Sequence, residues 1–166
     1  WTTDLLEIEE SDVLLEVGIG NGSTLHRIVA STKVRKIFGL DLSDEMIKEA
    51  EKLNKEYIED GMIVLHKGNV ISLPYKDSFF DKVISVHTLY FWTDINQGFS
   101  EIHRILKPGG KLYLSITDKS QMEKMKRTKN FHLIKTEEIE KLLANHMFQT
   151  ITLHQKGMYW CIEATK

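Results

Sequence analysis

The chain has 166 residues, of which 42% are hydrophobic and 28% charged, as is usual for one globular domain, and we expect a single domain over residues 1–166. A net charge of −2 gives no overall field toward nucleic acid or an anionic membrane, and no apolar run approaches the roughly 20 residues of a membrane span. The single cysteine, Cys161, excludes an internal disulfide and favours a reducing compartment, so we expect a cytoplasmic protein.

The first predicted strand, Val13–Val17, leads into a turn with three glycines in five residues, Gly18-Ile19-Gly20-Asn21-Gly22. Helical spacing begins at once in Ser23–Ser31. A strand, a glycine-rich turn and a helix in this order open nucleotide-binding α/β units. Glycines let the backbone turn sharply and let a ligand approach the main chain where no Cβ intervenes.

Strands and helices then alternate along the chain. Further strands are predicted at residues 36–41, 62–66, 82–86 and 111–116. Ser43 caps one helix, residues 95–106 form a strongly amphipathic one that ends at Lys-Pro-Gly-Gly (107–110), and Thr136 caps another. The alternating segments 148–153 and 158–164 form a hairpin around residues 154–157. This order predicts an α/β fold, a mostly parallel doubly wound sheet with an antiparallel last strand.

Two acidic residues lie where parallel strands end beside a ligand. Asp41 closes the second strand, 23 residues after Gly18, and a carboxylate there accepts both hydroxyls of a ribose. The alternative is an aspartate that caps the following helix. Glu16 lies in the first strand, where a buried acid needs a partner. That partner is either a cationic group of the ligand or one of Arg27 and Lys36.

Polar and aromatic residues also follow the third and fourth strands. Asn69 can meet an adenine edge, with Val70 as a main-chain partner, or it can be a turn asparagine. Residues 85–92, Ser-Val-His-Thr-Leu-Tyr-Phe-Trp, hold three aromatic rings that face a cationic or flat ligand or pack against the next helix. His87 and Tyr90 are the candidate catalytic residues there, His87 as a general base or as a structural histidine.

Taken together, five segments in register resemble the class I S-adenosylmethionine-dependent methyltransferases, from about Asp12 to Lys166. The segments are Glu16-Val17-Gly18-Ile19-Gly20-Asn21-Gly22, Asp41, Gly68-Asn69-Val70, residues 72–83 and Leu106-Lys107-Pro108-Gly109-Gly110-Lys111-Leu112. The third of these more often carries an aspartate in the family, and the fourth resembles the small-molecule branch (type 11/25-like). The family fold is a seven-stranded sheet with an antiparallel last strand, which agrees with the predicted hairpin.

The resemblance implies S-adenosylmethionine as cofactor and assigns residues to each part of it. The methionine part would lie against Glu16, Gly18, Gly20, Asn21, Gly22 and the main chain of Ser85–His87, the ribose against Asp41, and the adenine against Leu42, Asn69 and Val70. Transfer from an activated sulfonium is an in-line displacement that depends on positioning. A general base is needed only if the acceptor must lose a proton.

Motifs of other methyltransferase branches are missing from the sequence. There is no Asp/Asn-Pro-Pro-Tyr or Pro-Cys after the fourth strand, no glutamate pair there, and no carboxylate cluster for a metal. A small-molecule acceptor is therefore expected, with no metal, nucleic-acid or membrane partner. Basic residues between 119 and 129 either attract an anionic acceptor or form a solvated face; they are Lys119, Lys124, Lys126, Arg127 and Lys129. Any residues before Trp1 would form a substrate lid.

Two other functions compete with this interpretation. A nicotinamide-dependent oxidoreductase predicts the turn G-x-G-x-x-G, but residue 23 is serine and the third glycine comes one residue early. It also predicts a parallel last strand. A non-catalytic module that keeps the fold is the second alternative, against which the intact glycines and Asp41 argue.

Overall fold

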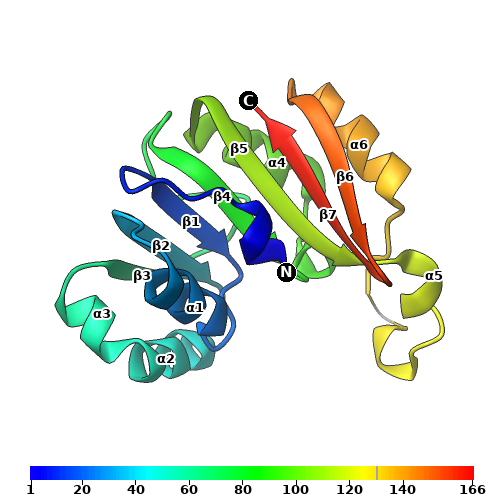
Figure 1. Ribbon diagram of the computed structural model, residues 1–166. Helices are drawn as coiled ribbons and strands as arrows, with labels where there is room; N and C mark the ends of the chain where they lie inside the picture. Colours follow the sequence, from blue (N-terminus) through cyan, green and yellow to red (C-terminus); the bar gives the residue numbers. More distant parts are fainter. Residues whose placement is uncertain (130) are drawn as a thin grey trace.

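The computed structural model describes residues 1–129 and 131–166 (Figure 1). The strands are β1 (Val13–Val17), β2 (Lys36–Asp41), β3 (Ile63–Lys67), β4 (Phe80–Val86), β5 (Leu106–Thr117), β6 (Gln149–Lys156) and β7 (Tyr159–Thr165). The helices are α1 (Ser23–Ser31), α2 (Asp44–Leu53), α3 (Lys55–Glu59), α4 (Ile95–Ile105), α5 (Lys119–Met122), α6 (Thr136–Asn145) and the 3-10 helices η1 (Thr2–Leu5), η2 (Leu89–Phe91) and η3 (Lys126–Thr128). Within the described ranges no helix is long and apolar enough to span a membrane.

The strands form one seven-stranded sheet in the order β3-β2-β1-β4-β5-β7-β6. Neighbours from β3 to β5 are parallel, whereas β7 is antiparallel to both β5 and β6. This confirms the predicted doubly wound, mostly parallel sheet with an antiparallel last strand. Because the chain builds outward from β1 in both directions, its order reverses between β1 and β4. Ligands of α/β sheets bind at such a switch point, outside the carboxyl ends of the strands.

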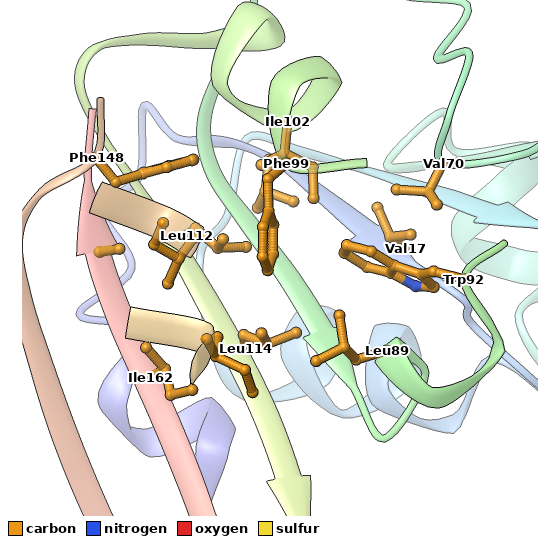
Figure 2. Packing of buried hydrophobic residues seen from close by; sticks show 14 of the residues in the cluster. Val17, Val70, Leu89, Trp92, Phe99, Ile102, Leu112, Leu114, Phe148 and Ile162 are labelled. Carbon is orange, nitrogen blue, oxygen red and sulfur yellow. The ribbon is translucent and has the colours of Figure 1, made fainter. Parts of the chain in front are cut away.

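Both faces of the sheet are covered by helices, so each central strand serves two apolar clusters. In β1, Leu14 packs with Leu25 and Ile28 of α1, while Leu15 belongs to the cluster of Phe99 on α4. This explains the near-continuous apolar runs of the strands. Figure 2 shows the second cluster, in which residues of α4 lie beside residues of the sheet: Phe99, Ile102, Leu112, Leu114 and Ile162.

Several predicted boundaries differ from the structure, most of them by one residue, and three differences have a clear physical reason. Thr136 is the first residue of α6, and Lys135 occupies the cap position without a side-chain hydrogen bond. Residues 154–156 pair with β7 and belong to β6, so the hairpin turn is shorter than predicted. Residues 107–110 lie inside β5, at a register shift opposite Phe80 and Lys82 of β4. Each difference arises from pairing between strands or from end geometry that local patterns do not encode.

Arg104 of α4 anchors the loop that follows β3. Its guanidinium donates to the carbonyl oxygens of Leu73 (3.1 Å) and Tyr75 (2.8 Å) and pairs with Asp77 (2.7 Å) and Glu101 (2.8 Å). Glu101 in turn accepts the Leu73 N–H at 2.7 Å, and its bond with Arg104 lowers the pKa of the Glu101 carboxyl. A loop without regular structure is thereby held against α4 where the chain passes from β3 to the start of β4.

Leu112 of β5 is fully buried in the cluster of Figure 2, so we expect Leu112→Ala to lower the free energy of unfolding by about 2–5 kcal/mol through lost burial and the cavity left behind. Leu53→Ala, at a leucine that is 45% exposed, is the matched control and should change it by about 0.5 kcal/mol or less. Urea denaturation followed by circular dichroism measures both. Equal losses in the two variants would contradict this account of the core.

Candidate functional site

A cavity of about 390 Å³ lies at the switch point between β1 and β4. Its wall is mostly apolar and comes from the residues that end or follow β1, β2, β3 and β4: Val17, Gly18, Gly20, Leu40, Asp41, Leu42, Gly68, Asn69, Val70, Val86, Thr88, Phe91, Trp92 and Thr93. The structure therefore gathers Gly18, Gly20, Asp41, Leu42, Asn69 and Val70 as the sequence predicted. We call this space the first cavity.

The glycines of the turn serve different purposes. All three have positive φ, and Gly20 (φ +53°) has no heavy atom within 4 Å of where a Cβ would lie. A Cβ on Gly18 (φ +76°) would overlap the side chain of Thr88, and one on Gly22 would lie 2.8 Å from the Cβ of Ala50. Gly20 is thus the glycine whose missing side chain leaves room beside the first cavity, while the other two allow contacts within the protein.

Asp41 combines the two roles that the sequence left open. One carboxylate oxygen accepts the N–H of Gly20 at 3.0 Å, and the other accepts the N–H of Ser43 at 2.9 Å. Ser43 itself caps α2 by accepting the Met46 N–H. Each carboxylate oxygen has a further lone pair, and Asp41 lines the first cavity. The aspartate therefore ties the glycine turn to β2 and still presents acceptors to a ligand.

The residues predicted beside an adenine lie along one side of the first cavity. Leu42 is 64% exposed, Val70 is buried, and Asn69 follows β3. The Asn69 side-chain oxygen accepts the Ile71 N–H at 3.3 Å, so the turn role of this residue is also present. The side-chain nitrogen of Asn69 takes no part in that bond, so its two N–H groups can donate to another acceptor.

Thr88 is a residue of the first cavity that was not predicted from the sequence to contact a ligand, whereas Phe91 and Trp92 are among the aromatic residues predicted to face a ligand or to pack against the next helix. The Thr88 hydroxyl donates to the Val17 carbonyl at 3.3 Å, shares a short hydrogen bond with Ser85, and accepts the Trp92 indole N–H at 3.2 Å. The contact of Thr88 with Gly18 depends on β1 and β4 lying side by side. The sequence held one signal for this contact: Thr88 is a small residue soon after the strand that pairs with β1, which leads into the glycine turn.

Glu16 is buried in β1, 1% exposed, and pairs with neither Arg27 nor Lys36. The pKa of its carboxyl is raised to about 8, mainly by burial. A hydrogen bond from Thr24 lowers the pKa, and the nearby charge of Asp41 raises it by a smaller amount. One carboxylate oxygen, Oε2, has no hydrogen-bond partner in the described part of the chain. A buried acid with an unsatisfied oxygen fits a site that receives a donor from a ligand.

Asn21, Ser85, His87 and Tyr90 lie outside the wall of the first cavity. Asn21 is exposed and accepts the Ser23 N–H, and Ser85 is buried against Thr88. The backbone N–H of His87 donates to the carbonyl oxygen of Ser115. The backbone carbonyl oxygen of His87 takes no part in this bond and can accept from other partners. His87 and Tyr90 instead line a second cavity of about 380 Å³ beside the ends of β4 and β5.

The geometry of the first cavity fits an adenosyl group. It offers apolar walls for a flat base, a carboxylate for the sugar hydroxyls and an open glycine backbone, at the end of the sheet where nucleotides bind. Residues 15–114, more than half of the chain, match the family of methyltransferase domains. The chain belongs to this family and is a class I S-adenosylmethionine-dependent methyltransferase.

Individual proteins agree with this assignment. The chain is 33% identical over 131 residues to the uncharacterized methyltransferase YdaC of Bacillus subtilis (strain 168), covering 79% of this chain and 70% of YdaC. An S-adenosylmethionine-dependent methyltransferase of Aquifex aeolicus has the same fold, with TM-score 0.83 and 18% identity over 98% of this chain and 86% of that one. A Haloferax volcanii chain solved with the Trm112 methyltransferase activator also shares it, with TM-score 0.86 and 18% identity over 99% and 86%.

We expect Gly20→Ala to weaken binding of S-adenosylmethionine at least tenfold, because the added methyl group enters the space that the turn leaves open. Gly61→Ala is a matched control, since Gly61 also has positive φ (+71°) and open space but lies away from the first cavity. Both variants should lose about 1–2 kcal/mol of stability from the left-handed backbone. Titration calorimetry and thermal unfolding separate the effects; equal affinities in the two variants would contradict the prediction.

The pKa of Glu16 also predicts how stability depends on pH. In the unfolded chain this carboxyl loses its proton near pH 4.5, whereas in the folded chain it holds the proton until about pH 8. The folded state is therefore favoured at low pH and loses stability as the pH rises between these values, by up to about 1.4 kcal/mol per pH unit.

Glu16→Gln removes this titration. The free energy of unfolding of this variant should therefore increase relative to that of the wild type as the pH rises from 5 to 8. Urea denaturation of both proteins at several pH values measures the difference. A difference that stays constant over this range would show that Glu16 titrates normally.

Proposed function

We propose that the chain transfers the methyl group of S-adenosylmethionine to a small-molecule acceptor by in-line displacement. The observation that carries the proposal is the first cavity, in which the open Gly20 backbone and the Asp41 carboxylate meet at the switch point of the sheet. Two cavities of a few hundred Å³ at the same edge give room for a cofactor and a separate small acceptor.

In this proposal, different residues of the site bind different parts of the cofactor. Asp41 accepts the ribose hydroxyls with its remaining lone pairs. Leu42 packs on the adenine, and the Asn69 amide and the Val70 main chain meet its edge. Glu16, which is buried and not part of the wall of the first cavity, meets the methionine amino group, directly or through water, with the Oε2 atom that lacks a partner.

The chemistry requires alignment more than side-chain catalysis. A lone pair of the acceptor forms a bond to the methyl carbon while the carbon–sulfur bond breaks and its electron pair stays on sulfur. Holding the reacting atoms in line, about 3–3.5 Å apart, supplies on the order of 7–11 kcal/mol. An acceptor that carries a proton on its nucleophilic atom must also release it to water or to a base.

Of the two candidate catalytic residues, His87 is better suited to take that proton. Burial lowers the pKa of its imidazole, so the ring is neutral at pH 7 and can accept a proton. Burial raises the pKa of the Tyr90 hydroxyl, which accepts the Thr117 N–H at 2.6 Å and lies 3.4 Å from the Thr117 carbonyl. Tyr90 therefore serves to fix the end of β5 against η2.

Calorimetry with three ligands tests this proposal against its two competitors. A methyltransferase binds S-adenosylmethionine and its demethylated product, S-adenosylhomocysteine, but not NAD. Binding of NAD alone would support an oxidoreductase, and binding of none would support a non-catalytic module. Incorporation of labelled methyl groups into a metabolite pool, with the protein pool as comparison, then tests whether the acceptor is small.

Asp41→Ala should weaken S-adenosylmethionine binding by about 1.5–3 kcal/mol, the range for a hydrogen bond to a charged group. Asp44→Ala is the control, because Asp44 lies three residues away on α2 and outside the first cavity. Calorimetry gives the affinities, and circular dichroism checks that the variants fold after loss of the Gly20 and Ser43 bonds. An unchanged affinity in a folded Asp41→Ala protein would refute the ribose assignment.

A further inference from the structure

The second cavity lies beside the carboxyl ends of β4 and β5, next to the first. Its wall comes from four parts of the chain: the end of β4 with η2, the end of β5, the segment from α5 onward, and the β6–β7 turn. The lining residues are His87, Tyr90, Thr117, Met122, Met125, Thr128, Phe131, Met158 and Tyr159. No residue is shared with the wall of the first cavity.

The wall of the second cavity is unusual in its sulfur and ring content. Three of the chain's six methionines line it, Met122, Met125 and Met158. The rings of Phe131 and Tyr90 are stacked at 16°, with their centroids 6.0 Å apart, and the ring centroids of Tyr159 and His87 are 5.6 Å apart. Methionine adapts its shape to a ligand, and its sulfur makes favourable contacts with aromatic rings.

Two polar side chains of this wall are engaged within the protein, whereas the Nδ1 atom of His87 is buried and has no hydrogen-bond partner in the described part of the chain. The Tyr90 hydroxyl bonds with Thr117, and the Thr128 hydroxyl donates to the carbonyl oxygens of Met122 and Met125 (2.8 Å for the latter). His87 is uncharged at neutral pH. The wall is therefore mostly thioether and ring, with the uncharged imidazole of His87 among them.

Charged side chains of the same segment point elsewhere. Lys124, Lys126 and Lys129 are exposed, and Lys119 lines a different, polar depression with Asp118. Leaving aside the side chains of residues 127 and 130, no Asp, Glu, Lys or Arg lines the second cavity. A charged ligand would lose its hydration there without gaining a partner, which is costly. Of the two interpretations of these lysines, the geometry favours a solvated face.

The walls of the two cavities are formed in part by consecutive residues of one segment. Val86 and Thr88 line the first cavity and His87, with φ +57°, lines the second. In the same way Phe91 lines the first and Tyr90 the second. The two cavities thus lie on either side of the short segment that follows β4, and the nucleophilic atom of the acceptor must reach past this segment to the cofactor.

We propose that the second cavity binds the methyl acceptor and that this acceptor is an uncharged aromatic molecule. The inference rests on the proposed function, because it takes the first cavity as the place of the cofactor. It specifies what the small acceptor is: a flat, apolar ring system whose nucleophilic atom enters beside His87.

Three probes that share one ring system test the charge preference. 2-Naphthol is neutral at pH 7, 2-naphthoate is an anion, and 2-naphthylmethylammonium is a cation. Each is titrated by calorimetry into protein saturated with S-adenosylhomocysteine, so that no turnover occurs. We expect 2-naphthol to bind at least tenfold more tightly than either ion. Equal or tighter binding of an ion would overturn the inference.

Substitutions place the probe in the second cavity. Met158→Asp adds a charge to the wall at a residue that is 40% exposed, and should weaken 2-naphthol binding at least tenfold. Met147→Asp is the matched control, at a methionine 69% exposed and outside this cavity, and Met158→Leu should retain binding. An unchanged affinity in Met158→Asp would overturn the inference.

The affinity for S-adenosylhomocysteine separates failure of this inference from failure of the proposed function. It should be unchanged in all three variants, which also shows that they fold. If S-adenosylhomocysteine does not bind the wild type, the proposed function fails. If it binds and 2-naphthol shows no preference or no dependence on Met158, the methyltransferase assignment stands and the aromatic acceptor is wrong.

Discussion

The contact between Thr88 and Gly18 is the constraint on which the site depends. The Thr88 side chain fills the space that a side chain at residue 18 would occupy, and its hydroxyl bonds with β1, β4 and the Trp92 indole. These bonds fix the carboxyl ends of β1 and β4 at the point where the sheet reverses its connection order. Because Thr88 packs against the turn after β1 at Gly18, the backbone at Gly20 can remain open to a ligand. The first cavity is therefore a product of packing between two neighbouring strands, and neither strand could form it alone.

Much of the fold and half of the candidate site could be predicted from the sequence, for a common physical reason. The alternation of strands and helices, the glycine turn and Asp41 are each encoded in a few consecutive residues. Parallel strands then bring their ends together without further information. Thr88 and Met158 were not predicted as site residues, because their place depends on which strands become neighbours and where the last hairpin turns. The hairpin turn itself was set too long, since residues 154–156 gain their strand pairing only from β7.

Electrostatics distinguish the two cavities. The first has a carboxylate at Asp41 that is bound by two backbone N–H groups, with Glu16 buried behind it and protonated at neutral pH. The second has no charged group among the described side chains that line it, and a histidine whose charged form is disfavoured by burial. A polar, hydroxyl-bearing ligand is matched by the first and an uncharged ring by the second. In the proposed function, the fold would thus place two ligands of different polarity on either side of one short segment of chain.

This division also explains where acceptor choice can change without loss of the fold. Val17 and Leu40 of the first cavity are buried residues at the ends of β1 and β2, so a change at either disturbs the sheet. The methionines of the second cavity come from α5, the loop before η3 and the β6–β7 turn, which are short elements at the border of the sheet. Substitutions in such segments cost less stability than those in the core. A new acceptor would therefore arise from changes at Met125 or Met158 while Gly20 and Asp41 stay fixed, and cofactor binding would be kept as the acceptor changes.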